Sequence, residues 1–273
     1  MGGSSVNFGN SWSGGEGVVL AVAHPGHELR LSTWIGRERP LVLVLTTGSR
    51  NGSDRTRVAA SAALAGALGA EPGPIFGRHL DREVYRWAME GRSEPFAALA
   101  EELADVFLCR RARRVVVDSW QLYNVVHDLW HLTVRAAAAM ASRRLGEPIA
   151  CYDYPVVPQS PGMPAAGPQR LGLRLAPAQV ERKLALARAF PGIAGDVAEV
   201  LRAGGRAFLA GETLHALRPV SELAPPPGAK PLYESFGEAR VAAGLYSDVL
   251  RWRHVAPIVE RLGAQLEAAV EPA

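Results

Sequence analysis

The chain has 273 residues, of which 48% are hydrophobic, and its formal net charge is +3. This length and hydrophobic content suffice for one large domain with a buried core. The charge comes from arginines scattered among acids, and no basic run is interleaved with aromatic residues, which argues against a nucleic-acid-binding protein. Two cysteines, Cys109 and Cys151, are too few for a disulfide framework.

The first part of the chain carries no pattern of a targeting or membrane segment. Residues 1–17 are rich in Gly, Ser and Asn, and they lack the basic start and apolar centre of a signal peptide. Elsewhere Arg, Gly or Pro interrupts each apolar run before it reaches the length of a membrane span. We therefore expect a flexible N-terminus and a cytoplasmic protein without a membrane partner. Assembly into a homo-oligomer is compatible with the sequence.

Apolar runs alternate with helical patterns along residues 18–154, which is typical of a doubly wound α/β fold. The predicted strands cover 18–23, 41–45, 75–76, 115–117 and 149–152. The predicted helices cover 28–35, 57–69, 93–109 and 127–145. Because the strands are almost continuously apolar, we expect a mostly parallel, Rossmann-like sheet that is buried on both faces.

The composition changes at Pro155, where a proline-rich stretch predicts an extended loop that ends at about Gly172. Helices are predicted at 178–190, 195–203 and 245–269. We expect residues 18–154 to form the core of the domain, and residues 155–273 to be a C-terminal extension packed on that core.

Three histidines are predicted at the carboxyl edge of this sheet. His24 and His27 follow the first strand directly, and His127 follows the strand 115–117 in a transition from loop to helix. Open α/β sheets bind their ligands beyond the carboxyl ends of the strands, and neutral imidazole is a common ligand of zinc. The sequence therefore predicts a site for zinc or another divalent metal. A pairing of His127 with His131, one turn later, is a weaker alternative than a packed helical role for His131.

Four short motifs in residues 18–150 resemble the PIG-L/LmbE-like family of metal-dependent N-deacetylases. That family has His-Pro-Asp-Asp-Glu after the first strand, Thr-x-Gly after the second, an Arg opening the next helix, and His-Pro-Asp-His after a later strand. This chain has His-Pro-Gly-His-Glu at 24–28, Thr-Thr-Gly at 46–48, Arg57, and Asn-Val-Val-His-Asp at 124–128.

The resemblance implies metal ligands at His24, His27 and His127, with His27 in place of the family's aspartate. It also implies two departures. Gly26 stands where the family has the aspartate that acts as general base, and Asn124 stands where it has a histidine thought to stabilise the oxyanion. An amide donates a hydrogen bond to an oxyanion but carries no proton.

Glu28 and Asp128 are the candidates for the missing base, since each directly follows a predicted ligand. In the functional interpretation, either carboxylate acts as the base or accepts a hydrogen bond that orients an imidazole. The equally good alternative is that each is an acid that stabilises the first turn of a helix. Arg57 is a candidate for binding an anionic or hydroxyl-rich substrate, and Asp81 for lining the same cleft. A surface arginine and a helix-start acid are the alternatives for these two.

The sequence thus favours a zinc-dependent hydrolase that removes an N-acyl group, with N-acetyl preferred, from a small polar or sugar-like substrate. A metal- or ligand-binding protein that has lost hydrolysis is the second interpretation. A metal-assisted enzyme of another reaction class on the same scaffold is the third.

Overall fold

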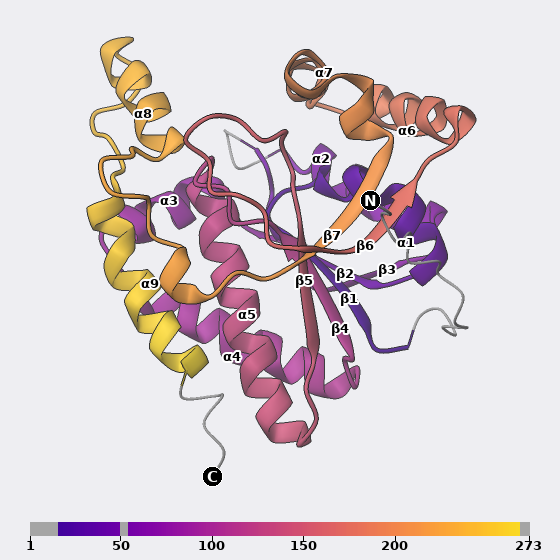
Figure 1. Cartoon of the computed structure of the whole chain (residues 1–273), viewed down its shortest axis with the longest axis horizontal. Helices are drawn as coiled ribbons and strands as arrows, with labels where there is room; N and C mark the ends of the chain where they lie inside the picture. Colours follow the sequence, from indigo (N-terminus) through magenta and orange to yellow (C-terminus); the bar gives the residue numbers. More distant parts are fainter. Residues whose placement is uncertain (1–15, 50–53, 268–273) are drawn as a thin grey trace, which may run out of the picture.

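The strands of the computed structural model form one seven-stranded sheet within the residues that it describes, 16–49 and 54–267 (Figure 1). The strands are β1 (Val18–Val22), β2 (Leu41–Thr46), β3 (Glu71–His79), β4 (Arg114–Asp118), β5 (Ala150–Tyr154), β6 (Gln169–Arg174) and β7 (Gly211–Ala216). The helices are η1 (His27–Leu31), α1 (Ser32–Glu38), α2 (Thr56–Ala67), α3 (Asp81–Met89), α4 (Glu94–Cys109), α5 (Val125–Leu145), α6 (Pro177–Ala189), α7 (Ala194–Leu209), η2 (Val220–Glu222), α8 (Leu232–Ala242) and α9 (Trp252–Glu267).

The sheet confirms the predicted mostly parallel α/β class. Its strand order is β3-β2-β1-β4-β5-β7-β6, and the first five of these are parallel. Strand β7 runs antiparallel to both β5 and β6. The chain leaves β1 toward β2 and β3, then returns to place β4 on the other side of β1. This reversal creates the crevice at the carboxyl ends of β1 and β4 where such sheets bind ligands.

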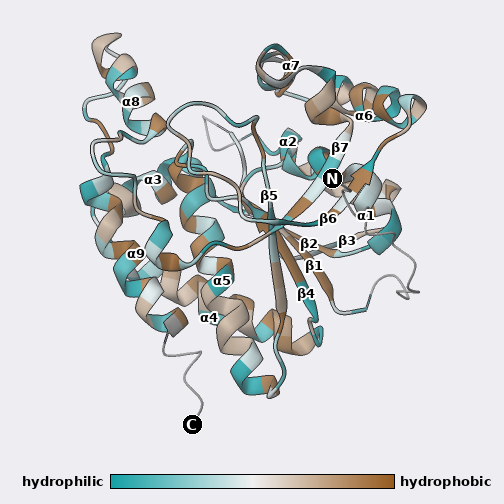
Figure 2. Cartoon of the chain, in the orientation of Figure 1, coloured by the Kyte–Doolittle hydropathy of each residue, from teal (hydrophilic) through white to brown (hydrophobic). Residues whose placement is uncertain are grey.

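Helices cover both faces of the sheet, which explains why β1 is apolar throughout. Val19 and Ala21 belong to one hydrophobic cluster with residues of α3, α4, α5 and α9. Leu20 and Val22 belong to another, with residues of α1 and α2. Figure 2 shows the central strands mainly in the hydrophobic colours, whereas the helices carry both hydrophobic and hydrophilic residues. A strand buried on both faces has no place for a polar side chain until it ends.

Several elements differ from the predicted ones. Residues 27–31 form a 3₁₀ turn before α1, and β3 is longer than the predicted strand at 75–76. Helix α3, helix α8 and strands β6 and β7 have no counterpart in the prediction. The two strands are half-buried and carry charged residues, so their pattern resembles that of a loop. The last helix begins at Trp252 rather than at residue 245.

The segment after residue 154 contributes to the same sheet, because β7 pairs with β5 and β6 pairs with β7. Helix α9 packs on α5. The division at residue 154 stays a prediction, and most of the predicted flexible N-terminus, residues 1–15, lies outside the described residues. None of the described helices is long and apolar enough to cross a membrane.

A buried ion pair between Lys183 of α6 and Glu212 of β7 also contacts the start of α1. The Lys183 ammonium lies 2.7 Å from Glu212 Oε1 and donates to the Arg30 carbonyl at 2.7 Å. Glu212 also accepts the backbone N–H groups of Thr33 and Trp34. Burial lowers the pKa of Lys183 to about 8, while the Glu212 carboxylate opposes that change.

Removal of the Lys183 charge alone is expected to destabilise the chain, because it leaves the Glu212 carboxylate buried without its cation. We expect Lys183→Met to lower the free energy of unfolding by about 3 kcal/mol in urea titrations. The exposed pair of Lys230 and Glu238 offers a matched control, and Lys230→Met should change stability by less than about 0.5 kcal/mol. Equal effects of the two substitutions would contradict this account.

Candidate metal centre

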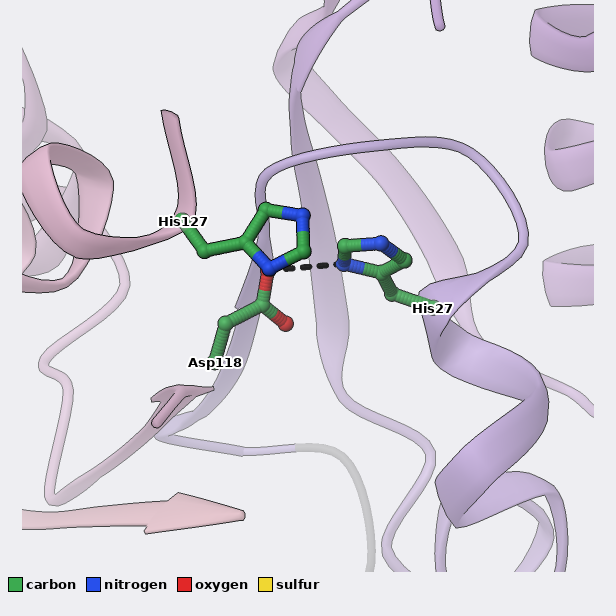
Figure 3. Close-up of side chains that lie close together, drawn as sticks. All are labelled: His27, Asp118 and His127. Atoms are coloured by element: carbon green, nitrogen blue, oxygen red, sulfur yellow. Dashed lines mark hydrogen bonds and ion pairs between the residues drawn. The ribbon is translucent and has the colours of Figure 1, made fainter. Parts of the chain in front are cut away.

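Four polar side chains converge beyond the carboxyl ends of β1 and β4. His24 and His27 follow β1, Asp118 is the last residue of β4, and His127 lies in the first turn of α5. Gly26 makes the turn between the first two histidines with a φ of 105°, a conformation that side chains rarely adopt. Figure 3 shows His27, Asp118 and His127 pointing toward one another.

The three predicted histidines are close together. The ring centroids of His24 and His27 are 5.1 Å apart, and that of His127 lies 4.9 Å from His24 and 4.5 Å from His27. Burial, and to a lesser extent the charges of the two neighbouring imidazoles, lower the pKa of His127 well below its usual value. A neutral imidazole keeps the lone pair that binds a metal.

Asp118 was not predicted as a member of this group, yet it makes the most contacts. Its Oδ2 lies 2.8 Å from His27 Nδ1 and accepts the Ala23 N–H at 2.8 Å, while Oδ1 accepts the Tyr154 hydroxyl at 2.7 Å. Burial opposes the charge of this carboxylate, but His27 and these hydrogen bonds outweigh burial and lower the pKa of Asp118. The carboxylate is therefore ionised at neutral pH.

His27, Asp118 and His127 each offer a ligand atom within 4.8 Å of the others. Two imidazole nitrogens and a carboxylate oxygen are a donor set that zinc and other divalent metals accept. His24 is not in this group of three, but its ring is adjacent to the rings of His27 and His127. The residues present thus fit a divalent metal, with two candidate sets that share His27 and His127.

Two carboxylates lie behind the imidazoles. His24 Nδ1 is 3.0 Å from Asp81 Oδ1 and 2.7 Å from the Thr46 hydroxyl, in the same way that His27 Nδ1 faces Asp118. Histidines that bind metals commonly direct their second nitrogen to a carboxylate, which fixes the ring. Asp81 also lines the cavity described below. Burial raises its pKa, but His24, Thr46 and Arg57 outweigh that effect, and the net change is downward.

The two predicted candidate bases, Glu28 and Asp128, have partners other than the histidines. The Glu28 carboxylate accepts the Gly26 N–H at 2.8 Å and the Ser61 hydroxyl. Asp128 Oδ1 accepts the Gln121 N–H at 2.9 Å, and burial raises the pKa of Asp128 to about 8. Neither carboxylate is among the residues that line the cavity. Both contacts support the alternative that these acids stabilise the local backbone.

Asn124 and Arg57 line the cavity but already have backbone partners. Asn124 Oδ1 accepts the Val126 N–H and caps α5. The Arg57 guanidinium donates to the Gly48 carbonyl at 2.8 Å and to the Pro25 carbonyl at 2.7 Å. Arg57 therefore ties the histidine loop to the loop after β2, in addition to any contact with a substrate.

His131 is fully buried, and its Nδ1 lies 2.8 Å from the Asp118 carbonyl oxygen. Because a carbonyl only accepts, the imidazole donates this hydrogen bond, and it holds the end of β4 in place. The packed helical role that the sequence favoured for His131 agrees with this position. Asp118 was not among the predicted site residues. The available signal in the sequence was its position as an acidic residue directly after the apolar run 115–117.

A cavity of about 590 Å³ opens above the histidines, within the range of about 300–1,000 Å³ that is typical of small-molecule sites. Its floor includes His24, His27 and His127, and its walls come from Tyr85, Tyr123, the segment 156–163 and helices α6, α7 and α8.

No family model matches the chain, and no curated protein matches it. Among solved structures, the conserved protein TT1542 from Thermus thermophilus is similar over 79% of this chain and 99% of its own, with 15% identity and a TM-score of 0.46. Teicoplanin deacetylase Orf2, in a zinc-inhibited form, is similar over 63% of this chain and 83% of its own (18% identity, TM-score 0.39). A40926 pseudoaglycone deacetylase Dbv21 is similar over 70% and 86% (17% identity, TM-score 0.39). Likeness of this degree says nothing about the chemistry of this chain.

The two candidate ligand sets make different predictions for zinc binding, measured by isothermal titration on the purified full chain. If three histidines bind the metal, His24→Ala, His27→Ala and His127→Ala each abolish tight binding, whereas Asp118→Asn weakens it about 10- to 100-fold. His79→Ala, outside the cavity lining, is the matched control and should bind as the unmodified chain does. Loss of tight zinc binding in Asp118→Asn, together with unchanged zinc binding in His24→Ala, would show that Asp118 and not His24 is the third ligand. Retention in all variants would contradict both sets.

The Asp118 carboxylate should also stabilise the fold in a pH-dependent way. Its pKa is lowered in the folded chain, so its contribution is present above the unfolded pKa of about 3.9 and is lost as the pH falls through the folded value. We expect Asp118→Asn to cost about 3 kcal/mol of unfolding free energy at pH 7 and less at pH 3. Ser142→Ala removes a neutral hydrogen bond to Ala138, and its effect should be the same at both pH values. A pH-independent effect of Asp118→Asn would contradict the assignment.

Proposed function

We propose that this chain is a metal-dependent hydrolase of the PIG-L/LmbE-like type, which removes an N-acyl group, N-acetyl in particular, from a small polar or sugar-like molecule. The observation that carries the proposal is the cluster of three imidazoles backed by two carboxylates. The cluster lies at the switch point of the sheet and on the floor of a cavity of substrate size.

His24, His27 and His127 would hold the metal, which is zinc or another divalent ion, and Asp118 is close enough to contribute an oxygen. When bound, such an ion polarises the carbonyl of an amide and lowers the pKa of water. Asp81 and Asp118 would keep the rings of His24 and His27 in place for this purpose.

The proton released during hydrolysis needs an acceptor inside the cavity. Glu28 and Asp128 do not line it, whereas Asp81 does, and Asp81 also contacts His24 directly. We therefore assign proton acceptance to Asp81 in place of the two acids that the sequence suggested. The Asn124 amide and backbone N–H groups of the same wall would donate to the oxygen of the tetrahedral intermediate.

A second candidate function is supported by the loop itself. Gly26 occupies the family's base position, and its φ of 105° disfavours any other residue there in this conformation. With Glu28 and Asp128 also outside the cavity, the chain is then a metal- or ligand-binding protein that has lost hydrolysis. The two functions differ in turnover rather than in metal binding.

Amine release from N-acetylglucosamine and related N-acetylated sugars tests the proposal. The zinc-loaded chain should release amine, and Asp81→Asn should lower kcat by about 10² to 10⁴ while zinc affinity falls no more than about 100-fold. Asp196 on α7 lines the same cavity from the opposite wall, and Asp196→Asn is the matched control with nearly unchanged turnover. Zinc bound tightly with no amine released from any substrate would favour the binding protein.

A further inference from the structure

A second, smaller pocket lies between α1, α2 and α6, which are on the same side of the molecule (Figure 1). Its volume of about 300 Å³ is at the lower end of the range for small-molecule sites. Gln179, Arg182 and Lys183 line it from one face of α6, and Ser32 and Thr33 line it from the start of α1. None of the described residues that line this pocket is acidic.

The Lys183 ammonium brings an unused donor to this pocket. An ammonium group has three N–H donors. Glu212 Oε1 and the Arg30 carbonyl oxygen engage two of them, at 2.7 Å each, and the described part of the chain holds no third acceptor for this nitrogen. The Lys183 side chain is only 2% exposed, so solvent has little access to the remaining donor. A ligand in the pocket is therefore the partner that this donor lacks.

The neighbouring side chains add further donors. Gln179 Oε1 accepts the Ala176 N–H at 2.8 Å, which leaves the amide N–H groups of Gln179 for the pocket. Arg182 is exposed, and no ion pair of its guanidinium is found in residues 16–49 and 54–267. The Glu212 carboxylate balances the charge of Lys183, so the charge of Arg182 remains in excess. The pocket thus combines many donors with a net positive charge.

From this arrangement we infer that the pocket between α1, α2 and α6 is an anion site, separate from the metal centre. It takes a small molecule with a carboxylate or phosphate group, whose oxygens accept hydrogen bonds from Lys183, Arg182 and the Ser32 and Thr33 hydroxyls. Ammonium and guanidinium groups are the common protein partners of such oxygens. Lys183 also lines the cavity above the histidines, so the two sites share one wall.

Three sugars of similar size test this site and distinguish its two possible anions. Isothermal titration at low ionic strength would compare glucose 6-phosphate, glucuronate and neutral glucose on the full chain, dialysed free of metal and of chelator. At least one of the two anionic sugars should bind about tenfold or more tightly than glucose, because a hydrogen bond to a charged group contributes about 1.5–3 kcal/mol. The tighter of the two identifies the group that the pocket prefers.

Three exposed arginines locate the binding, since their substitution leaves the core intact. Arg182→Gln should weaken binding of the preferred anionic sugar about tenfold. Arg188 is also on α6 but lines neither cavity, so Arg188→Gln should bind as the unmodified chain does. Arg202 lines only the cavity above the histidines, and Arg202→Gln should likewise keep the affinity.

Several results would overturn the inference. These are equal affinity for glucose and both anionic sugars, the same loss in Arg188→Gln as in Arg182→Gln, or a loss in Arg202→Gln without one in Arg182→Gln. The last result would place the anion in the cavity above the histidines. Arg182 is outside the lining of that cavity, so Arg182→Gln should leave zinc affinity and amine release unchanged. Failure of the proposed hydrolysis therefore leaves the anion site in place, and the reverse also holds.

Discussion

The buried carboxylate of Asp118 is the interaction on which the rest of the site depends. It joins the end of β4 to the end of β1 through the Ala23 N–H, to the histidine loop through His27, and to β5 through the Tyr154 hydroxyl. A buried charge is stable only where several donors surround it. The positions of these three strands therefore fix the orientation of His27.

The fixed orientation of the histidine rings determines which of their nitrogen atoms can bind a metal. His24 Nδ1 and His27 Nδ1 both face carboxylates, so in the three-histidine set these two rings would bind the metal through Nε2. The carboxylates next to the predicted ligands in sequence, Glu28 and Asp128, are engaged with the backbone or with Ser61, so the proposed hydrolysis assigns the proton to Asp81.

Sequence patterns predicted the parts of this structure that depend on local periodicity. The parallel core and the approach of His24, His27 and His127 followed from apolar strands whose carboxyl ends share one edge. Asp118 escaped because its partner His27 is 91 positions away, and nothing in the local pattern indicates that contact. Glu28 and Asp128 do not line the cavity although each follows a predicted ligand, because successive residues of a helix point in different directions. Strands β6 and β7 were missed because half-buried strands near a sheet edge carry few apolar residues.

The coordination of zinc in the loaded chain tests the central claim most directly. X-ray absorption spectroscopy of the protein with one equivalent of zinc should show nitrogen and oxygen ligands at about 2.0–2.1 Å, including at least two imidazoles, and this imidazole signal should be lost in His127→Ala, which no longer binds zinc tightly. A zinc environment without imidazole, or one that is identical in His127→Ala, would contradict a metal centre at this edge of the sheet.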